Sequence, residues 1–150
     1  MANKIVLDAS VFIKLFLKEP DTEEAIRLID ALGKKQYKVL APTLFLYEVL
    51  GVAVAERLQT NANRVHELIS DYREHNLELM DVDDKTIRKA IDISNTGNEK
   101  SGYPDFYDSI YHALAIVNGC HFITADKRHK VKTENIGNIT LLEDWEEIVI

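Results

Sequence analysis

Short apolar stretches that alternate with segments of helical length constrain the fold of this 150-residue chain more than any other feature. The apolar stretches, which predict strands, cover residues 4–7, 37–42, 77–82, 120–126 and 139–142. The helical patterns cover residues 9–19, 20–35, 43–59, 62–75, 84–97 and 104–119. This alternation indicates a parallel sheet with helices on both faces. We therefore predict an α/β fold, formed as a single domain over residues 1–150.

Charge and composition narrow the class of protein. The net charge of −7 argues against a general nucleic-acid coat, which would be basic. It does not exclude an enzyme that acts on nucleic acid through bound metal. The single cysteine, Cys120, excludes a disulfide framework within the chain and a cysteine-based metal site. The N-terminus leads directly into a strand, and no apolar run is long enough to span a membrane, so we expect a cytoplasmic protein.

Local signals predict where several helices begin and end. Asp21, with Glu24 three residues later, is typical of a helix N-cap. Gly97 and Gly119 follow the last periodic residues of two helices, where glycine commonly ends a helix.

Two carboxylates directly follow predicted strands. Asp8 ends the stretch "KIVLD" and Asp126 ends "FITAD". In an open parallel sheet, ligands bind beyond the carboxyl ends of the strands. We therefore expect Asp8 and Asp126 to lie together at that edge of the sheet.

Two further acids lie inside apolar helices. Glu48 is in "LFLYEVLGVAV", and Asp108 is in "PDFYDSIYHALAI", one turn after Asp105. A carboxylate on a buried face is costly unless it is paired or coordinates a metal.

Taken singly, each acid also has a structural explanation. These explanations are an N-cap for Asp8, a surface position or a pair with Arg57 or a lysine for Glu48, a solvent-facing position for Asp108, an N-cap for Asp105 and a turn for Asp126. For Asp105 the N-cap is the preferred interpretation. For the other four, one arrangement explains them together. Clustered carboxylates repel one another, and a hard divalent cation such as Mg²⁺ or Mn²⁺ relieves that repulsion.

The chain resembles the PIN domain family, and within it the VapC-type toxins of type II toxin–antitoxin systems. The matching stretches are "VLDASVFIKLF", "YEVLG", "YDSIYHALAIVNG" and "FITADKR", in that order over essentially the whole chain. The resemblance implies a Rossmann-like three-layer fold and a Mg²⁺- or Mn²⁺-dependent endoribonuclease that cleaves single-stranded RNA with a metal-activated water. It implies that Asp8, Glu48, Asp108 and Asp126 are the catalytic and metal-binding acids. Ser10 and Thr124 match hydroxyl residues that support these acids, and Asp105 stays a secondary candidate.

The resemblance also implies partners, namely a homodimer and a small antitoxin that covers the active groove. The helix 43–59 is apolar nearly all round, which is more than one buried face requires. We therefore expect residues such as Leu46 and Val49 to be exposed and available for an interface.

The segment "DKRHKVK" is the densest basic stretch and begins at Asp126. One interpretation is that Lys127 and Arg128 contact RNA phosphates, and the alternative is a solvated surface loop. The histidines show no metal-ligand spacing such as H-E-x-x-H, so we interpret them as structural or surface residues.

Other functions fit the sequence less well. A response-regulator receiver places its phospho-accepting Asp on the third strand and a Lys on the last, and "ITLL" has no Lys. A haloacid-dehalogenase-type phosphatase needs a second Asp two residues after Asp8, where Ser10 stands. The absence of glycine in "DASVF" argues against dinucleotide binding. A cellular RNA-processing PIN nuclease without an antitoxin, and a catalytically silent PIN-fold binding module, stay open as alternatives.

Overall fold

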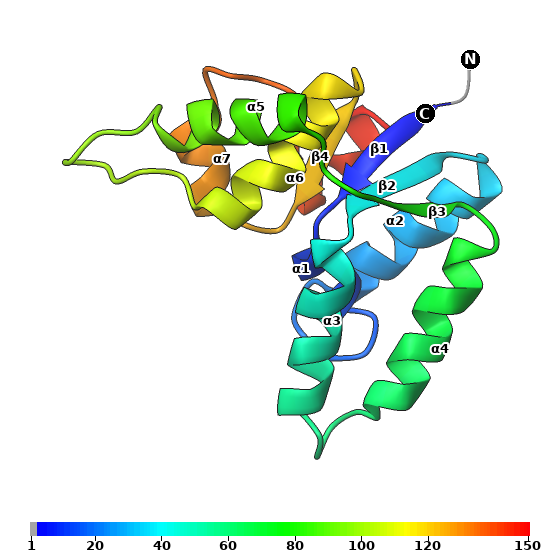
Figure 1. The fold of residues 1–150 in the computed structure, drawn as a ribbon. Helices are drawn as coiled ribbons and strands as arrows, with labels where there is room; N and C mark the ends of the chain where they lie inside the picture. The colour runs from blue at the N-terminus through cyan, green and yellow to red at the C-terminus, as the bar shows by residue number, and fades with distance from the viewer. Residues whose placement is uncertain (1–2) are drawn as a thin grey trace.

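The computed structural model describes residues 3–150 and is built around one five-stranded sheet (Figure 1). The elements are β1 (Lys4–Leu7), α1 (Ala9–Ile13), α2 (Thr22–Lys34), β2 (Lys38–Pro42), α3 (Leu44–Ala55), α4 (Ala62–Arg73), β3 (Leu77–Met80), α5 (Asp84–Ser94), α6 (Phe106–Val117), β4 (His121–Thr124), α7 (Lys127–Thr133), β5 (Ile139–Leu141) and the 3₁₀ helix η1 (Leu142–Glu147). All strand pairs are parallel, in the order β3-β2-β1-β4-β5. The predicted α/β fold with a parallel sheet is confirmed.

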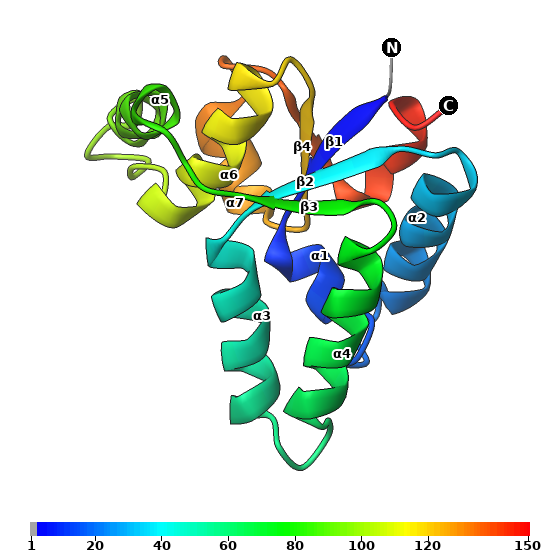
Figure 2. The ribbon, with the colours of Figure 1, turned by 45° about the vertical axis from the view of Figure 1, so that its right-hand side comes forward.

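Helices cover both faces of the sheet, which makes three layers (Figure 2). Helices α1 to α4 lie on one side, and α6 packs against β1, β2 and β4 from the other side. Helix α5 packs on the outside of α6, through a small core that includes Ala90, Ile93, Ile110 and Ala113. The chain adds β2 and β3 on one side of β1 and then crosses over to add β4 and β5 on its other side. Open parallel sheets bind ligands at such a switch point, which here lies between β1 and β4.

The central strand β1 is buried because helices cover it on both sides. Its residues Ile5, Val6 and Leu7 are all in the core, as expected for a strand of a parallel sheet. Leu7 pairs with Ile123 on β4, and the backbone N–H of Asp8 donates to the carbonyl of Ile123 at 3.0 Å. This register sets Asp8 at the carboxyl edge, next to the end of β4.

The helix predicted over residues 9–19 is much shorter in the structure. Helix α1 ends at Ile13, and the chain then turns around a buried lysine, Lys14. Its ammonium group lies 3.0 Å from the Glu19 carboxylate and 2.8 Å from that of Asp21. Asp21 does precede α2, but its side chain makes no cap hydrogen bond. Asp21 is therefore the N-cap residue of α2, as predicted, but its carboxylate pairs with Lys14 instead of capping the helix.

The two predicted glycine caps have different outcomes. Gly119 has a φ of +67° and follows α6, so it ends that helix as predicted. Gly97 is not a cap, since α5 already ends at Ser94. Glycine is needed at this position because the backbone at Gly102 passes close by. A Cβ built on Gly97 would lie 2.2 Å from the carbonyl oxygen of Gly102.

Helix α3 buries one face and exposes another. Phe45, Val49 and Ala53 lie in the core, while Tyr47 and Val54 are exposed. The prediction that Val49 is exposed is therefore wrong, and Leu46 is only partly buried. No helix within residues 3–150 is both long enough and apolar enough to span a membrane.

Candidate active site

The acids predicted to act together line one pocket at the carboxyl edge of the sheet. Asp8 follows β1, Glu48 is on α3, Asp108 is in the first turn of α6 and Asp126 follows β4. The pocket has a volume of about 470 Å³, and it is also lined by Ser10 and Tyr47 among others. The fold thus brings together side chains from four segments far apart in the sequence.

Asp8 is the most buried of the acids, with only 4% of its surface exposed. Its Oδ2 accepts hydrogen bonds from the hydroxyls of Ser10 at 2.8 Å and Thr124 at 2.7 Å. Burial raises the pKa of the Asp8 carboxyl, the two hydroxyl hydrogen bonds oppose that shift, and the nearby Asp126 adds to it. The side chain of Asp8 does not cap α1, so the N-cap explanation is wrong for its side chain.

The two supporting hydroxyls also join the ends of β1 and β4. The Thr124 hydroxyl oxygen accepts from the backbone N–H of Asp126 at 3.0 Å, and that of Ser10 accepts from the N–H of Ala125 at 3.3 Å. The Asp8 carboxylate is therefore fixed in one orientation by groups that are themselves fixed. The structure places Ser10 and Thr124 against the acid they were predicted to support.

Glu48 is held by a residue that the sequence analysis missed. The buried hydroxyl of Tyr111, on α6, donates to Oε1 of Glu48 at 2.6 Å. Burial raises the pKa of Glu48, the Tyr111 hydrogen bond opposes the shift, and Asp8 and Asp105 contribute to raising it. The alternative pairing of Glu48 with Arg57 is wrong, since the Arg57 guanidinium donates to the carbonyl of Val54.

Tyr111 remains a neutral donor, because burial and the adjacent Glu48 raise its pKa. Its position three residues after Asp108 offers one sequence signal, since residues three apart share a helix face. That signal does not distinguish it from an ordinary core tyrosine.

Asp108 faces the pocket from the first turn of α6. Burial raises the pKa of its carboxyl to about 7, and Asp8, Asp105, Asp126 and Glu48 all contribute by repulsion. The alternative that Asp108 simply faces solvent is wrong, because the side chain is half-buried and lines the pocket. Asp105 is the N-cap of α6, as preferred, because its carboxylate accepts from the backbone N–H of Asp108 at 3.1 Å.

Asp126 caps the helix that follows it. Its Oδ1 accepts from the backbone N–H groups of Arg128 at 2.9 Å and His129 at 3.3 Å. The segment considered as a possible surface loop is therefore helix α7, and the carboxylate both caps this helix and lines the pocket.

Two basic side chains of α7, Lys127 and Arg128, are exposed, and two, Lys130 and Lys132, are half-buried. The Arg128 side chain is 90% exposed, with its Nε 3.9 Å from Asp126. The Lys127 ammonium group lies 3.8 Å from Glu143. Neither arrangement is tight enough to prevent these side chains from meeting a phosphate.

Two histidines next to the site form a buried pair, in agreement with their structural interpretation. Nε2 of His112 lies 2.7 Å from the carbonyl oxygen of Gly137, so this nitrogen donates. Nδ1 of His112 then accepts from Nε2 of His129 at 3.2 Å. Burial lowers the pKa of both rings, that of His129 to about 4. Nδ1 of His129 has no hydrogen-bond partner among the described residues.

The chemistry of the four acids fits a hard divalent cation, since all the donors are carboxylate oxygens. The raised pKa values of Asp8, Glu48 and Asp108 show that burial and mutual repulsion disfavour their charged forms when no cation is bound. In residues 3–150, however, no three His, Cys, Asp or Glu side chains are arranged to hold a metal ion as they stand. We expect the carboxylate oxygens of the four acids to lie within roughly 4–8 Å of one another, close enough to share hydrated metal, and this stays a prediction.

Comparisons with known proteins identify the fold. The sequence matches the family described as PIN domain over residues 5–135. VapBC2 from Rickettsia felis, solved bound to a DNA fragment from their promoter, contains a chain with a TM-score of 0.66 and 15% identity, covering 92% of this chain and 96% of that one. PAE2754 from Pyrobaculum aerophilum gives a TM-score of 0.65 and 18% identity, covering 95% and 92%. A comparison with curated proteins finds no match.

Proposed function

The chain belongs to the PIN domain family, and from this premise we propose that it is a Mg²⁺- or Mn²⁺-dependent endoribonuclease of the VapC type. In this proposal, residues 1–150 form a single domain that cleaves single-stranded RNA in the cytoplasm. One observation carries it: four acids from four separate segments of a PIN fold line one pocket beside the ends of β1 and β4. A silent binding module would have no need to keep all four.

The proposed roles of the acids follow from their surroundings. A divalent cation bound here would help to orient a water molecule and to offset charge on the phosphodiester. Asp8 is held by Ser10 and Thr124, and Glu48 is held by Tyr111, so both present their oxygens in fixed positions. Asp108 accepts no hydrogen bond from the described residues that competes with a cation, and Asp126 caps α7 through Oδ1 alone.

Residues 3–150 offer no ready-made set of metal ligands, and this affects how a cation would bind. Mg²⁺ usually keeps several waters and is held directly by only one or two carboxylates. A site of four carboxylates around a pocket of about 470 Å³ leaves room for such waters. We therefore propose that part of the coordination passes through water, and that the carboxylates draw together on loading.

We also propose that the chain is a toxin that pairs with a small antitoxin and forms a homodimer. The support is the resemblance of the sequence to VapC-type toxins and the likeness of the fold to a chain of the R. felis VapBC2 structure. An RNA-processing PIN nuclease without an antitoxin would share the chemistry and differ in its partner.

Cleavage of a single-stranded RNA by the purified chain tests the proposed activity. We expect cleavage with Mg²⁺ or Mn²⁺, none in excess EDTA, and loss of most activity in Asp8→Asn. Asp92→Asn is the matched control, because Asp92 is an exposed acid on α5. Full activity in EDTA, or equal activity in Asp8→Asn and the control, would contradict the proposal.

A further inference from the structure

The exposed aromatic residues of this protein are concentrated at the acidic pocket. Within residues 3–150, four aromatic side chains are exposed: Tyr47 by 68%, Tyr103 by 51%, Phe106 by 38% and Tyr107 by 55%. Tyr47 is the neighbour of Glu48 on α3, and the other three lie just before Asp108 in sequence. The remaining tyrosine, phenylalanine and tryptophan rings of this range are buried or half-buried. One exposed ring therefore lines the pocket, and the other three lie within five residues of Asp108 in sequence.

The aromatic residues flank the pocket on two sides. Tyr47 itself lines the pocket on the α3 side. On the α6 side, Phe106 and Tyr107 occupy the same first turn as Asp108, and their rings are 5.9 Å apart in an edge-to-face arrangement. Tyr47 thus lines the pocket itself, whereas Phe106 and Tyr107 share the helical turn of Asp108 without lining the pocket.

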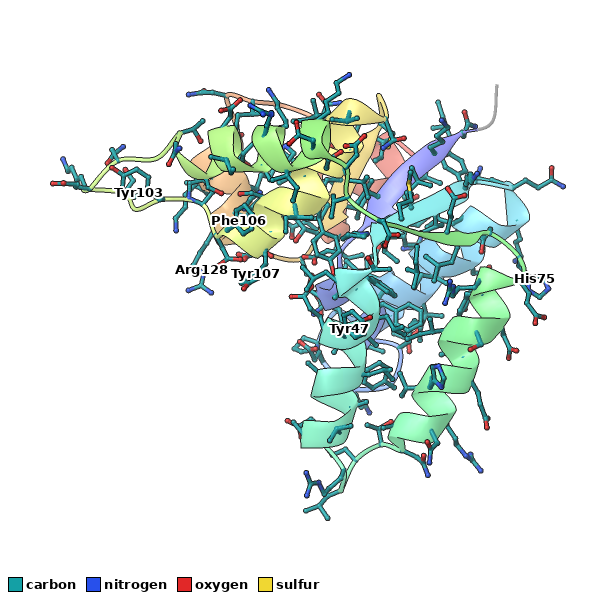
Figure 3. All side chains as sticks on the ribbon, viewed as in Figure 1. Tyr47, His75, Tyr103, Phe106, Tyr107 and Arg128 are labelled. Carbon is teal, nitrogen blue, oxygen red and sulfur yellow. The ribbon has the colours of Figure 1, made fainter. Side chains whose placement is uncertain are left out.

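Two cations of α7, the exposed Arg128 and the half-buried Lys132, lie toward the α6 side of this surface. In the view of Figure 3, Arg128, Tyr107 and Phe106 lie on the same side of the molecule, and Tyr47 lies on α3. The Lys132 ammonium group donates to the carbonyl oxygen of Tyr103 at 3.3 Å, so the end of α7 reaches the segment before α6. Aromatic rings beside exposed cations are what proteins use to bind single-stranded nucleic acid, because bases stack on the rings and phosphates meet the charges.

We infer that Tyr47 and Tyr107, extended by Phe106 and Tyr103, form a base-stacking platform for unpaired nucleotides on both sides of the phosphodiester held at the acids. The inference rests on the proposed nuclease function and names the form of its substrate. A phosphodiester carries one nucleoside on each side, and a base can stack on a side chain only when it is not paired within a duplex. The platform therefore selects unpaired strands, with little preference for base identity, since every base has a flat face.

Binding of short RNA strands in Mg²⁺ tests the platform apart from cleavage. The Asp8→Asn background keeps the strand intact, and a 2-aminopurine base beside the central phosphate reports stacking by its fluorescence. We expect Tyr47→Ala and Tyr107→Ala each to weaken binding by about five- to 150-fold and to lose the 2-aminopurine signal. Tyr107→Phe, which keeps the ring, should bind like the background protein. So should Ile26→Ala, an exposed apolar position on α2 that is not part of the pocket.

A second binding experiment uses an RNA strand that lacks the base beside the central phosphate, the base proposed to stack. This strand should bind the background protein more weakly than the normal strand, and Tyr107→Ala should add no further loss. Equal affinity for normal and abasic strands, or duplex RNA bound as tightly as single strands, would overturn the platform. So would absence of RNA binding by the background protein, since stacking does not need Asp8.

The same variants separate failure of the platform from failure of the nuclease. If the wild-type chain cleaves RNA but Tyr47→Ala and Tyr107→Ala bind RNA normally, the platform is wrong and the nuclease stands. If these variants instead change the sedimentation of the protein and leave its RNA affinity intact, the aromatic surface is an interface between copies, which also overturns the platform. If the wild-type chain binds RNA through these residues but does not cleave it with Mg²⁺ or Mn²⁺, the platform holds and the nuclease fails.

Discussion

At the scale of one residue, Asp108 shows how the metal-free site lowers the stability of the folded protein at neutral and higher pH. Its pKa is raised to about 7, so the folded protein takes up a proton that the unfolded chain, with a pKa near 3.8, would release. This group therefore contributes most stability at low pH, and the contribution is lost as pH rises through about 7. His129, whose pKa is lowered to about 4, gives the opposite slope below about 6.5.

A comparison with Asp108→Asn isolates this effect. In EDTA, we expect the variant to melt at a higher temperature than the wild type at pH 8 and to lose that advantage toward pH 5. Thermal melts of both proteins across this range provide the measurement. A constant difference in melting temperature at every pH would mean that the pKa of Asp108 is not raised in the folded protein.

Tyr111 is expected to position Glu48 for the reaction. Tyr111→Phe removes the hydroxyl that donates to Glu48, and we expect cleavage to fall about tenfold and the free energy of unfolding by about 1 kcal/mol. Tyr37→Phe is a matched control, since the Tyr37 hydroxyl donates to the carbonyl of Ile148 and does not line the pocket. The control should lose stability without losing activity. A similar loss of activity in both variants would mean that the role of Tyr111 is only structural.

At the same scale, the sequence predicted what depends on local pattern. Asp8 and Asp126 follow apolar strands, so a parallel sheet must bring them to one edge. Tyr111 and the His112–His129 pair could not be predicted, because their partners come from other elements and their types are ordinary for a core. Asp21 is the N-cap of α2 as predicted, but the sequence did not show that its carboxylate would pair with Lys14 rather than cap the helix.

At the scale of one element, helix α7 forms where the sequence left a surface loop open as an alternative. Its sequence, "KRHKVKT", is short and basic and has little apolar periodicity, so a loop was the structural alternative. The helix forms because Asp126 caps its first turn, while His129 and Thr133 are buried beneath it. The exposed basic residues are thereby held beside the pocket in a defined arrangement.

Loss of charge from α7 should weaken RNA binding in a salt-dependent way. For Lys127→Ala with Arg128→Ala, we expect lower affinity and a log–log salt dependence shallower by roughly 0.7 for each lost phosphate contact. Metal affinity should change little. Lys34→Ala, an exposed lysine on α2 paired with Asp30, is the control. Unchanged affinity and slope in the double variant would show that the basic face of α7 is only solvated surface.

For the whole molecule, the parallel sheet and its layers followed from the alternation of strands and helices, but the surface did not. Helix α3 is apolar nearly all round in sequence, and only the structure distinguishes buried Val49 from exposed Val54. Leu58, just beyond the helix, is fully exposed. Which side of such a helix meets the core depends on the register of its packing, which a uniform apolar pattern does not encode.

The exposed residues near the end of α3 give the proposed homodimer a specific test. We expect sedimentation analysis to show a dimer at tens of micromolar, and Val54→Asp to shift it toward monomer because a charge would be buried in the interface. Ile91→Asp, at an exposed apolar position on α5, is the control. A monomeric wild-type protein at these concentrations would count against the dimer.

The central claim is that Asp8, Glu48, Asp108 and Asp126 together bind a divalent cation. Crystals grown with Mn²⁺ and measured near the manganese absorption edge test it most directly, because anomalous scattering locates the ion independently of any activity. The account predicts an anomalous peak in the pocket, within coordination distance of at least one of these carboxylates or bridged to them by water. Crystals with Mn²⁺ bound only elsewhere on the protein, and none in this pocket, would contradict it.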